Sequence, residues 1–370
     1  MNKSGHILVI NPGSTSTKLA IYSYHADAGD LGITGETNLE HNQDHFSDNG
    51  PVLDQLSARL EAIHQFLESL GKDALDIQMI MARSAPLKPM LGGIYSVNED
   101  MLEDLRTAKY SNHASNLAAI LGEKIASEMG IPVFISDPIT TDELNPLARF
   151  SGVPGIERKS RSHALNIKAS TRKICDKHEL PFEESNWVVC HMGGGISVAA
   201  LKNGRIIDVN DALLGMGPFT PERAGALPIA GLLELAYSGE HDRASLESYL
   251  SRSSGLKGYL GTSDLKVIEA RIQDGDEEAK LIYDAMVYQI AKEIGAMASV
   301  HAFHLTGVIL TGGMANSTKL CLGISDRIAT IADVYIEPGE NELQALAEAG
   351  LRIVRGEEEV LSYRSDEDQN

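Results

Sequence analysis

The sequence predicts an α/β protein built from two similar domains. Segments with the apolar pattern of buried strands alternate along the chain with segments of helical apolar spacing, which is the order expected of an α/β fold. Two segments, residues 5–22 and 187–208, share one plan: a strand, a tip rich in Gly and Ser, and a second strand. The 370 residues are enough for two domains of about 100–200 residues each.

The expected elements follow in order along both halves. Short apolar runs predict strands at residues 7–10, 18–22, 77–81 and 131–135, on both sides of the tip within 187–208, and from Gly307. Apolar residues at helical spacing predict helices over 52–70, from the N-cap Asn98, over 116–129, over 277–302, and from near Asn341. The polar stretch 24–50 is expected to form surface strands and loops.

Composition narrows the class of protein. Lys and Arg number 32 against 52 Asp and Glu, a net charge of -20, which argues against nucleic-acid and anionic-membrane partners. The three cysteines, Cys175, Cys190 and Cys321, have no zinc or disulfide-framework spacing. No signal-peptide pattern precedes the first strand, and no apolar run approaches the ~20 residues of a membrane span. We therefore expect a soluble, cytoplasmic protein.

Three glycine-rich turns follow predicted strands, at residues 11–18, 193–197 and 312–317. Turn backbones can present N–H groups to phosphate oxygens, hydroxyl side chains add donors, and Lys18 adds a positive charge. A single turn of this kind more often only connects two strands. Three such turns in one chain favour phosphate binding, particularly because the turns at 11–18 and 193–197 share the same strand–tip–strand plan. The Walker A and dinucleotide-fold patterns are absent.

Three histidines lie near predicted strand or helix ends. His191 directly precedes the tip at 193–195, where ring N–H donors suit the charge that develops on a phosphoryl oxygen. His113 and His163 are flanked by small or polar residues. A lone histidine more often makes a structural hydrogen bond than takes part in catalysis, so both interpretations stay open.

Two arginines and an aspartate complete the candidates. Arg223 lies between Pro and Gly turns in GMGPFTPERAG, which favours bidentate oxyanion binding over an ion pair with Glu222. Arg83 follows a buried strand, and its pattern favours neither a site nor a surface position. Asp137 ends a strand before a proline, where its carboxylate could orient an arginine, support Mg²⁺ or cap the turn.

Taken in order, these motifs resemble the acetate and butyrate kinases. INPGSTSTK at 10–18 is similar to the first phosphate-binding segment of that family, and Pro12 is typical of its butyrate and branched-chain fatty-acid kinases. The match covers nearly the whole chain, through LKP at 87–89, NHASN at 112–116, DP at 137–138, ERKS at 157–160, HALN at 163–166, HMGGGISV at 191–198, GPFTPER at 217–223, YLGT at 259–262, ILTGG at 309–313 and PGENE at 338–342.

The resemblance implies an actin-like ATPase fold, in which two similar ribonuclease H-like domains have a nucleotide cleft between them. We expect an N-terminal domain at 1–150 and a nucleotide-binding domain at 151–344, because the Pro- and Gly-rich segment 146–155 marks a boundary. A C-terminal helix at about 345–370 is expected to pack back on the first domain. Family members are usually homodimers, so a homodimer is expected here.

The resemblance also implies a phosphotransferase with a carboxyl acceptor, of the butyrate kinase type. Such an enzyme transfers a phosphoryl group from ATP, reversibly and in line, to a short-chain, butyrate-like carboxylate, giving ADP and an acyl phosphate. A carboxylate with a pKa of about 4–5 is already ionised at pH 7, so no general base is required. The implied cofactors are ATP and Mg²⁺, which with cationic side chains offset the charge of the two anions.

Family roles carry over to matching positions of this sequence. The implied catalytic residues are Arg83, His163, Arg223 and Asp137. Arg83 and His113 would bind the substrate, and Glu342 would reach the metal. Phosphate and nucleotide would be held by Asn11, Ser14, Ser16, Lys18, His191, Gly193, Gly194, Gly195, Asp264, Gly312 and Gly313.

Four positions depart from the family pattern. Ser84-Ala85 stand where Gly-Gly is common, Ser162 stands where Phe is frequent, and Lys266 replaces an Arg and loses its bidentate reach. Because the change to Ser162 removes a large apolar wall, we expect a roomier or more polar acyl pocket than in a typical butyrate kinase.

Two alternatives stay open. The first is a kinase for another short acid, such as propionate or isobutyrate. The second is an actin-like ATP-binding protein without kinase activity. In such a protein the arginines and histidines named above would have no substrate acid to bind, which argues against this alternative.

Overall fold

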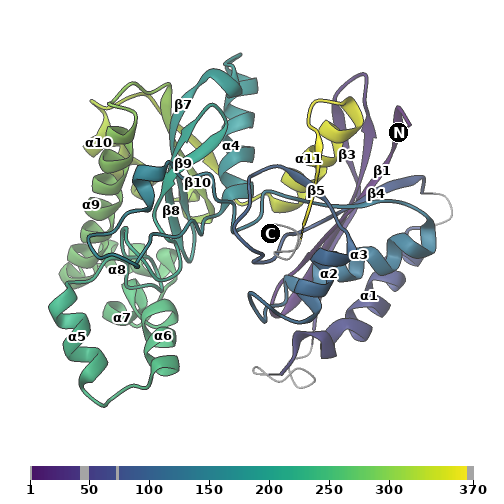
Figure 1. Cartoon of the computed structure of the whole chain (residues 1–370). Helices are drawn as coiled ribbons and strands as arrows, with labels where there is room; N and C mark the ends of the chain where they lie inside the picture. Colours follow the sequence, from purple (N-terminus) through teal and green to yellow (C-terminus); the bar gives the residue numbers. More distant parts are fainter. Residues whose placement is uncertain (1, 42–49, 72–74, 365–370) are drawn as a thin grey trace. The chain divides into compact units, whose positions relative to one another are not determined.

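The computed structural model describes residues 2–41, 50–71 and 75–364 (Figure 1). The chain divides into two compact units. Unit 1 contains Met1–Thr141 together with Asn341–Asn370, and unit 2 contains Asp142–Glu340. Among the helices of the described ranges, none combines the length and the apolar character needed to cross a membrane.

Unit 1 is built on a 7-stranded sheet in the order β12-β5-β6-β4-β1-β2-β3. Strands β1 (Ser4–Pro12), β2 (Ser16–His25) and β3 (Asp30–Glu40) form an antiparallel meander. Strands β4 (Ile77–Ala82) and β6 (Val133–Ser136) continue from β1 in parallel, and β5 (Ile94–Ser96) and β12 (Val360–Ser362) complete the sheet. The carboxyl ends of β1, β4 and β6 therefore meet at one edge, which is where open α/β sheets bind ligands.

Helices cover both faces of this sheet. Helices α1 (Leu56–Ser69), α2 (Glu99–Arg106) and α3 (Asn116–Met129) share one core with Leu8 and Ile10 of β1. Helix α11 (Glu342–Arg355) packs on the other face, where a side chain at Gly350 would come within 2.9 Å of Ile7. Successive residues of β1 thus face two helix layers, so the strand reads as a continuous apolar run. A short turn, η2 (Val52–Gln55), leads into α1.

Unit 2 is built on a 5-stranded sheet in the order β11-β10-β7-β8-β9. Strands β7 (Asn186–Met192), β8 (Ile196–Lys202) and β9 (Arg205–Val209) are antiparallel neighbours, and β10 (Gly307–Gly312) and β11 (Val334–Pro338) continue from β7 in parallel. This order and these directions repeat those of β3-β2-β1-β4-β6 in unit 1. The predicted α/β fold with two similar halves is confirmed.

Helices also cover both faces of the second sheet. Helix α4 (Ala164–Lys177) shares a core with Val189 and Ile309, whereas α9 (Glu277–Val300) and α10 (Thr318–Ile328) share one with Val188 and Leu310. The remaining helices of the unit are α5 (Ile229–Tyr237), α6 (Arg243–Arg252), α7 (Gly255–Leu260) and α8 (Leu265–Gln273), with the turns η4 (Pro146–Arg149), η5 (Phe182–Glu184) and η6 (Gly313–Asn316).

The end of the chain differs from expectation. A helix was expected over about 345–370, but α11 ends at Arg355, where Gly356 adopts a left-handed backbone (φ 70°), and β12 follows. Glycine adopts this conformation at little cost and commonly ends helices. Residues 365–370, and 42–49 of the stretch expected to form surface strands and loops, lie outside the described residues.

Candidate active site

The tip between β7 and β8 carries the first of the two predicted glycine-rich turns that lie in unit 2. The Gly193 N–H donates to the Gly195 carbonyl (3.0 Å), and the Thr220 hydroxyl donates to the Gly194 carbonyl (2.6 Å). A Cβ at position 195 would stand 2.3 Å from Nη1 of Arg223. A glycine is therefore required at this position for Arg223 to lie against the tip.

A cavity of about 710 Å³ lies beside this tip, entirely within unit 2. Its lining includes Gly193, Gly194, Asp264, Gly313 and Glu340. Nothing lies within 4 Å of where a Cβ of Gly313 would stand, so the cavity is open along that part of its wall. The volume lies within the ~300–1,000 Å³ range of small-molecule sites.

Two further residues that were predicted to bind the nucleotide, Gly312 and Asp264, have structural roles in unit 2. Gly312, at the end of β10, has φ 89°, and a Cβ there would stand 2.4 Å from the Met192 carbonyl oxygen. Asp264 caps α8 by accepting a hydrogen bond from the Lys266 N–H (2.9 Å). Both the aspartate and the lysine that replaces a family arginine line the cavity.

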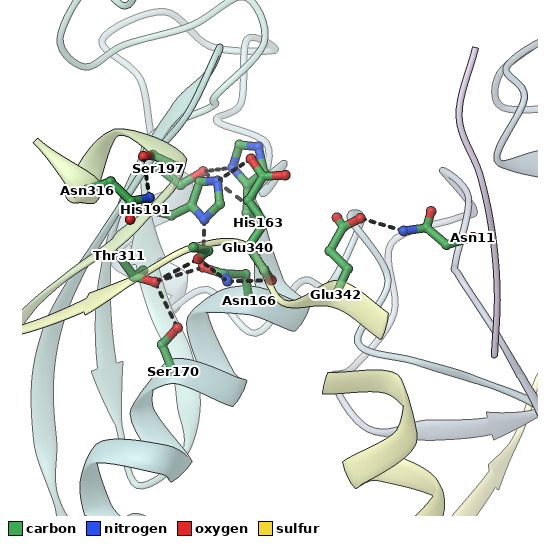
Figure 2. A network of polar contacts seen from close by, with 12 residues as sticks. Asn11, His163, Asn166, Ser170, His191, Ser197, Thr311, Asn316, Glu340 and Glu342 are labelled. Atoms are coloured by element: carbon green, nitrogen blue, oxygen red, sulfur yellow. Dashed lines mark hydrogen bonds and ion pairs between the residues drawn. The ribbon is translucent and has the colours of Figure 1, made fainter. Parts of the chain in front are cut away.

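His163 and His191 are stacked, with ring centroids 3.9 Å apart and an angle of 16° between the planes. His163 precedes α4, and its Nδ1 is 2.9 Å from the hydroxyl of Ser197. His191 is almost fully buried near the end of β7, and its Nδ1 is 2.6 Å from Oδ1 of Asn166 in α4 (Figure 2). The two histidines therefore form one unit rather than two separate candidates.

Hydrogen bonds at Asn166 determine which nitrogen of His191 carries a proton. Nδ2 of Asn166 donates to the carbonyl oxygens of Gly339 (3.3 Å) and Glu340 (2.9 Å), so Oδ1 must accept. Oδ1 accepts from Thr311 (3.3 Å) and from His191, whose Nδ1 is therefore protonated.

The environment of His191 keeps the ring neutral. Burial, reinforced by the neighbouring His163, holds the pKa of His191 well below its usual value. Since Nδ1 carries the proton, Nε2 is an acceptor, not the N–H donor that the sequence suggested. Within the described residues this Nε2 is buried without a hydrogen-bond partner, 3.9 Å from Oε1 of Glu340. It can therefore accept a hydrogen bond from a ligand or a bound water.

Arg223 is held by its own loop. Its backbone N–H donates to the Thr220 hydroxyl (3.0 Å), and its Nη1 donates to the Ala212 carbonyl. Its Nε is buried and has no partner within the described residues, and burial lowers the pKa of the guanidinium. This is a preorganised arginine with donor capacity left for an anion.

Unit 1 brings together three predicted residues from distant parts of the chain. Nη1 of Arg83 donates to Oδ1 of Asn11 (3.1 Å), Nη2 is 3.1 Å from Oε1 of Glu342, and Nδ2 of Asn11 donates to Oε2 of Glu342 (2.7 Å). Asn11 lies near the end of β1, Arg83 directly after β4, and Glu342 at the start of α11. The arginine therefore already binds a carboxylate, that of Glu342.

The hairpin tip between β1 and β2 carries the other predicted phosphate residues of unit 1. Ser14 and Lys18 are exposed, Ser16 is half-buried, and Lys18 lies opposite Asn11 across the hairpin. Arg59 of α1, which the sequence analysis did not select, bonds to this tip from within the core. Arg59 lies at helical spacing with Leu56 and Ile63, on the buried face of α1. A charged residue at an apolar position of a helix could have identified Arg59 from the sequence.

His113 and Asp137 lie elsewhere in unit 1. His113 is exposed before α3, and its Nδ1 accepts from the Ser115 N–H (3.2 Å). Asp137 is buried with φ 39°, a backbone conformation that residues other than glycine rarely adopt. Its Oδ1 accepts from the Gly93 N–H (2.9 Å), and its Oδ2 accepts from the Ser136 hydroxyl (3.3 Å).

Comparison with known proteins identifies the family. A sequence model described as the acetokinase family matches residues 155–362, more than half of the chain. The chain belongs to the acetokinase family. Membership implies a carboxylate phosphotransferase that uses ATP.

Three solved structures show the same fold. The chain is similar to an acetate kinase from Porphyromonas gingivalis, with TM-score 0.75 and 19% identity over 94% of this chain and 100% of that chain. A propionate kinase from Francisella tularensis gives TM-score 0.74 and 18% identity, over 93% of this chain and 98% of that chain. An acetate kinase from Entamoeba histolytica gives TM-score 0.76 and 17% identity, over 94% of this chain and 99% of that chain. At these identities the likeness shows the actin-like fold alone.

Proposed function

We propose that this chain is a short-chain carboxylate kinase of the butyrate kinase type, which transfers the terminal phosphoryl group of ATP to a carboxylate. The observation that carries this proposal is the convergence of a glycine tip, a preorganised arginine and a stacked histidine pair beside one cavity in unit 2. Phosphoryl transfer to an ionised carboxylate needs positioning and charge stabilisation rather than a base, and these groups provide both.

We propose that ATP binds in the cavity of unit 2. The glycines in the lining let a ligand approach the backbone, and the volume of about 710 Å³ accommodates a nucleotide. We propose that Gly193, Gly194 and Gly195 hold phosphates and that Gly312 and Gly313 lie near the adenosine. Asp264 belongs to the same nucleotide set.

Arg223 and His163 are proposed to stabilise the transferring phosphoryl group. The guanidinium of Arg223 lies against Gly195 of the tip, and its buried Nε is available to donate to an anion. His191 is proposed to act through Nε2, by accepting a hydrogen bond from a water that in turn contacts a phosphate.

Arg83 is proposed to bind the acid. Its guanidinium already pairs with the Glu342 carboxylate at 3.1 Å and donates to Asn11. A guanidinium has five N–H donors, so these two contacts leave donors for a substrate carboxylate. We propose that Asn11, Ser14, Ser16 and Lys18 contact phosphate. His113 is proposed to line the acyl site, and Asp137 to support the arginine by holding its loop.

Carboxylate side chains of this chain could contact a Mg²⁺ ion that is bound mainly through the phosphates of ATP. No cluster of three or more His, Cys, Asp and Glu side chains among the described residues could hold a metal ion. Mg²⁺ typically binds through substrate phosphates with only one or two carboxylates, so a complete protein cage is not needed. We propose Glu342 as its protein contact, with the cavity-lining Glu340 as the alternative acid. When bound, the metal would neutralise phosphate charge.

The acyl chain is proposed to be butyrate-like, with room for a longer, branched or more polar acid. Ser162 is buried, and its hydroxyl has no partner within the described residues. A small polar side chain at a position where relatives often carry Phe supports a larger or more polar pocket. Propionate and isobutyrate are the nearest alternatives.

A homodimer is proposed, with helix α5 in the contact between copies. The helix is strongly apolar, yet none of its residues is buried, and Ile229, Leu233 and Tyr237 are more than half exposed. Apolar surfaces of this kind are usually covered by a partner. Leu233→Glu should convert the dimer to monomer in sedimentation equilibrium, and a wild-type monomer would refute the proposal.

Hydroxylamine trapping of acyl phosphate tests the proposed function. The wild-type protein is incubated with Mg-ATP and acids from acetate to hexanoate, including branched and hydroxy acids. A maximum at butyrate or isobutyrate supports the full proposal, and a maximum at acetate refutes the roomier pocket. ATP binding without any acyl phosphate would favour the ATP-binding protein without kinase activity.

A further inference from the structure

A fully buried arginine lies under the hairpin tip of unit 1. Arg59 has 0% exposure, and its guanidinium donates to the carbonyl oxygens of Gly13 (2.9 Å), Ser14 (3.4 Å) and Ser16 (3.1 Å). The side chain is oriented by Gln55, whose Oε1 accepts from Nε (3.1 Å) and Nη2 (2.8 Å). One side chain of α1 thus ties down a turn more than 40 residues earlier in the sequence.

The four carbonyl oxygens of the tip are all bonded to donors of the protein itself. Arg59 binds three of them, and the His41 N–H binds the carbonyl of Thr15 (2.9 Å). The Gly13 N–H also donates to the Ser16 carbonyl (2.7 Å), which closes the turn. The negative ends of these peptide dipoles are thereby neutralised inside the protein, while Ser14 and Thr15 remain exposed.

The buried guanidinium also brings positive charge under the tip. Burial lowers the pKa of Arg59 to about 10, so the side chain remains charged at pH 7. Its Nη1 donates to the Thr17 hydroxyl (2.8 Å), which is 2.7 Å from Nε2 of His41. Burial and the charge of Arg59 lower the pKa of His41, which keeps that ring neutral.

We propose that Arg59 is a positioning residue for phosphate binding: it holds the tip so that hydroxyls rather than carbonyls face the ligand, and it adds positive charge beneath it. This role rests on the proposed function, in which Ser14 and Ser16 contact the phosphates of ATP. It predicts that Arg59 affects binding of the phosphates and not of the nucleoside.

Calorimetry with two ligands tests this role. Arg59→Met keeps much of the side-chain length but removes the charge and the donors, and Arg59→Lys keeps the charge but not the five-donor fork. We expect Arg59→Met to weaken ATP binding at least about tenfold, as loss of a hydrogen-bonded charge does, and Arg59→Lys to weaken it less. Adenosine affinity should stay within about twofold of wild type in both variants, because neither variant changes the cavity of unit 2.

Arg352→Met is the matched control. Arg352 is another largely buried arginine of unit 1, paired with Glu358 (2.7 Å), so its loss should lower Tm without changing either affinity. Unchanged ATP affinity in Arg59→Met, or equal losses for ATP and adenosine, would overturn the proposal. If Arg59→Met does not fold, Arg59→Lys decides in the same way. Because no acid is present, these affinities are independent of whether wild type forms acyl phosphate.

Discussion

The rings of His163 and His191 stack 3.9 Å apart, and Nδ1 of His191 is 2.6 Å from Oδ1 of the buried Asn166. His163 precedes helix α4, and His191 lies near the end of β7, a strand covered by that helix. The pair therefore joins two elements of unit 2. The fixed amide makes His191 an acceptor at Nε2, which distinguishes the chemical roles of two residues of the same type.

The first prediction concerns the stability of unit 2 in acid. The unfolded chain protonates His191 below about pH 6.5, whereas burial keeps the folded ring neutral, so stability falls as pH falls. One such group contributes at most about 1.4 kcal/mol per pH unit. Urea unfolding at pH 7.5 and 5.5 should show a smaller acid loss in His191→Gln than in wild type.

His25→Gln, an exposed change at the end of β2, is the control for that experiment and should keep the wild-type acid loss. Burial also lowers the pKa values of His41 and His301, and these two residues remain in His191→Gln. This variant should therefore still lose some stability in acid, but less than wild type. Equal losses in wild type and His191→Gln would show that His191 is not held neutral. Nitrogen NMR of wild type at pH 7 should show the proton on Nδ1.

The second prediction concerns Arg223. Arg223→Ala removes a preorganised guanidinium beside the phosphate tip and should lower kcat by about 10²–10³, the usual cost of losing a donor that stabilises transition-state charge. Arg205→Ala, at an exposed site on β9, should keep wild-type kcat. A change confined to the KM for ATP would assign Arg223 to ground-state binding instead.

The third prediction concerns Arg83. Arg83→Ala should raise the KM for the acid by about 10- to 150-fold, since hydrogen bonds to charged groups contribute about 1.5–3 kcal/mol. The affinity for ATP should change much less. Arg106→Ala, which removes an arginine paired with Glu99 on α2, should leave both constants unchanged. A selective effect on ATP would contradict a carboxylate-binding role for Arg83.

The fourth prediction separates two adjacent glycines. A Cβ at Gly312 would stand 2.4 Å from the Met192 carbonyl at φ 89°, so Gly312→Ala should unfold at a clearly lower temperature. Gly313→Ala meets nothing within 4 Å and should keep the wild-type Tm. It should nevertheless weaken ATP binding, because its methyl group enters the cavity wall. Wild-type ATP affinity in Gly313→Ala would place the adenosine elsewhere.

The fifth prediction concerns the metal. Glu342→Gln should raise the Mg²⁺ concentration needed for half-maximal activity at saturating ATP, and Glu340→Gln should not. Glu342→Gln should also lower the KM for the acid, because it removes the carboxylate that lies 3.1 Å from Arg83 and competes with the substrate for the guanidinium. A normal Mg²⁺ requirement in Glu342→Gln together with a raised one in Glu340→Gln would assign the contact to Glu340 instead.

The sequence by itself was sufficient to predict the fold class and the repeated plan. Strand runs at 7–10 and 77–81 are apolar because both faces of their sheet are covered, and glycine-rich tips follow because only small residues permit such close turns. These are local consequences of backbone geometry and burial. The motif order along the chain also pointed to the acetokinase family, which the match over residues 155–362 confirms.

Only the tertiary structure decided how the candidate residues combine. The contact between Asn11 and Glu342 joins residues 331 positions apart, and no local pattern encodes such a pair. The neutral state of His191 depends on burial and on Asn166, and the position of Arg59 under the tip depends on how α1 packs on its sheet. Hydrogen-bond partners and local dielectric are properties of the packed core, so they arise only when distant segments meet.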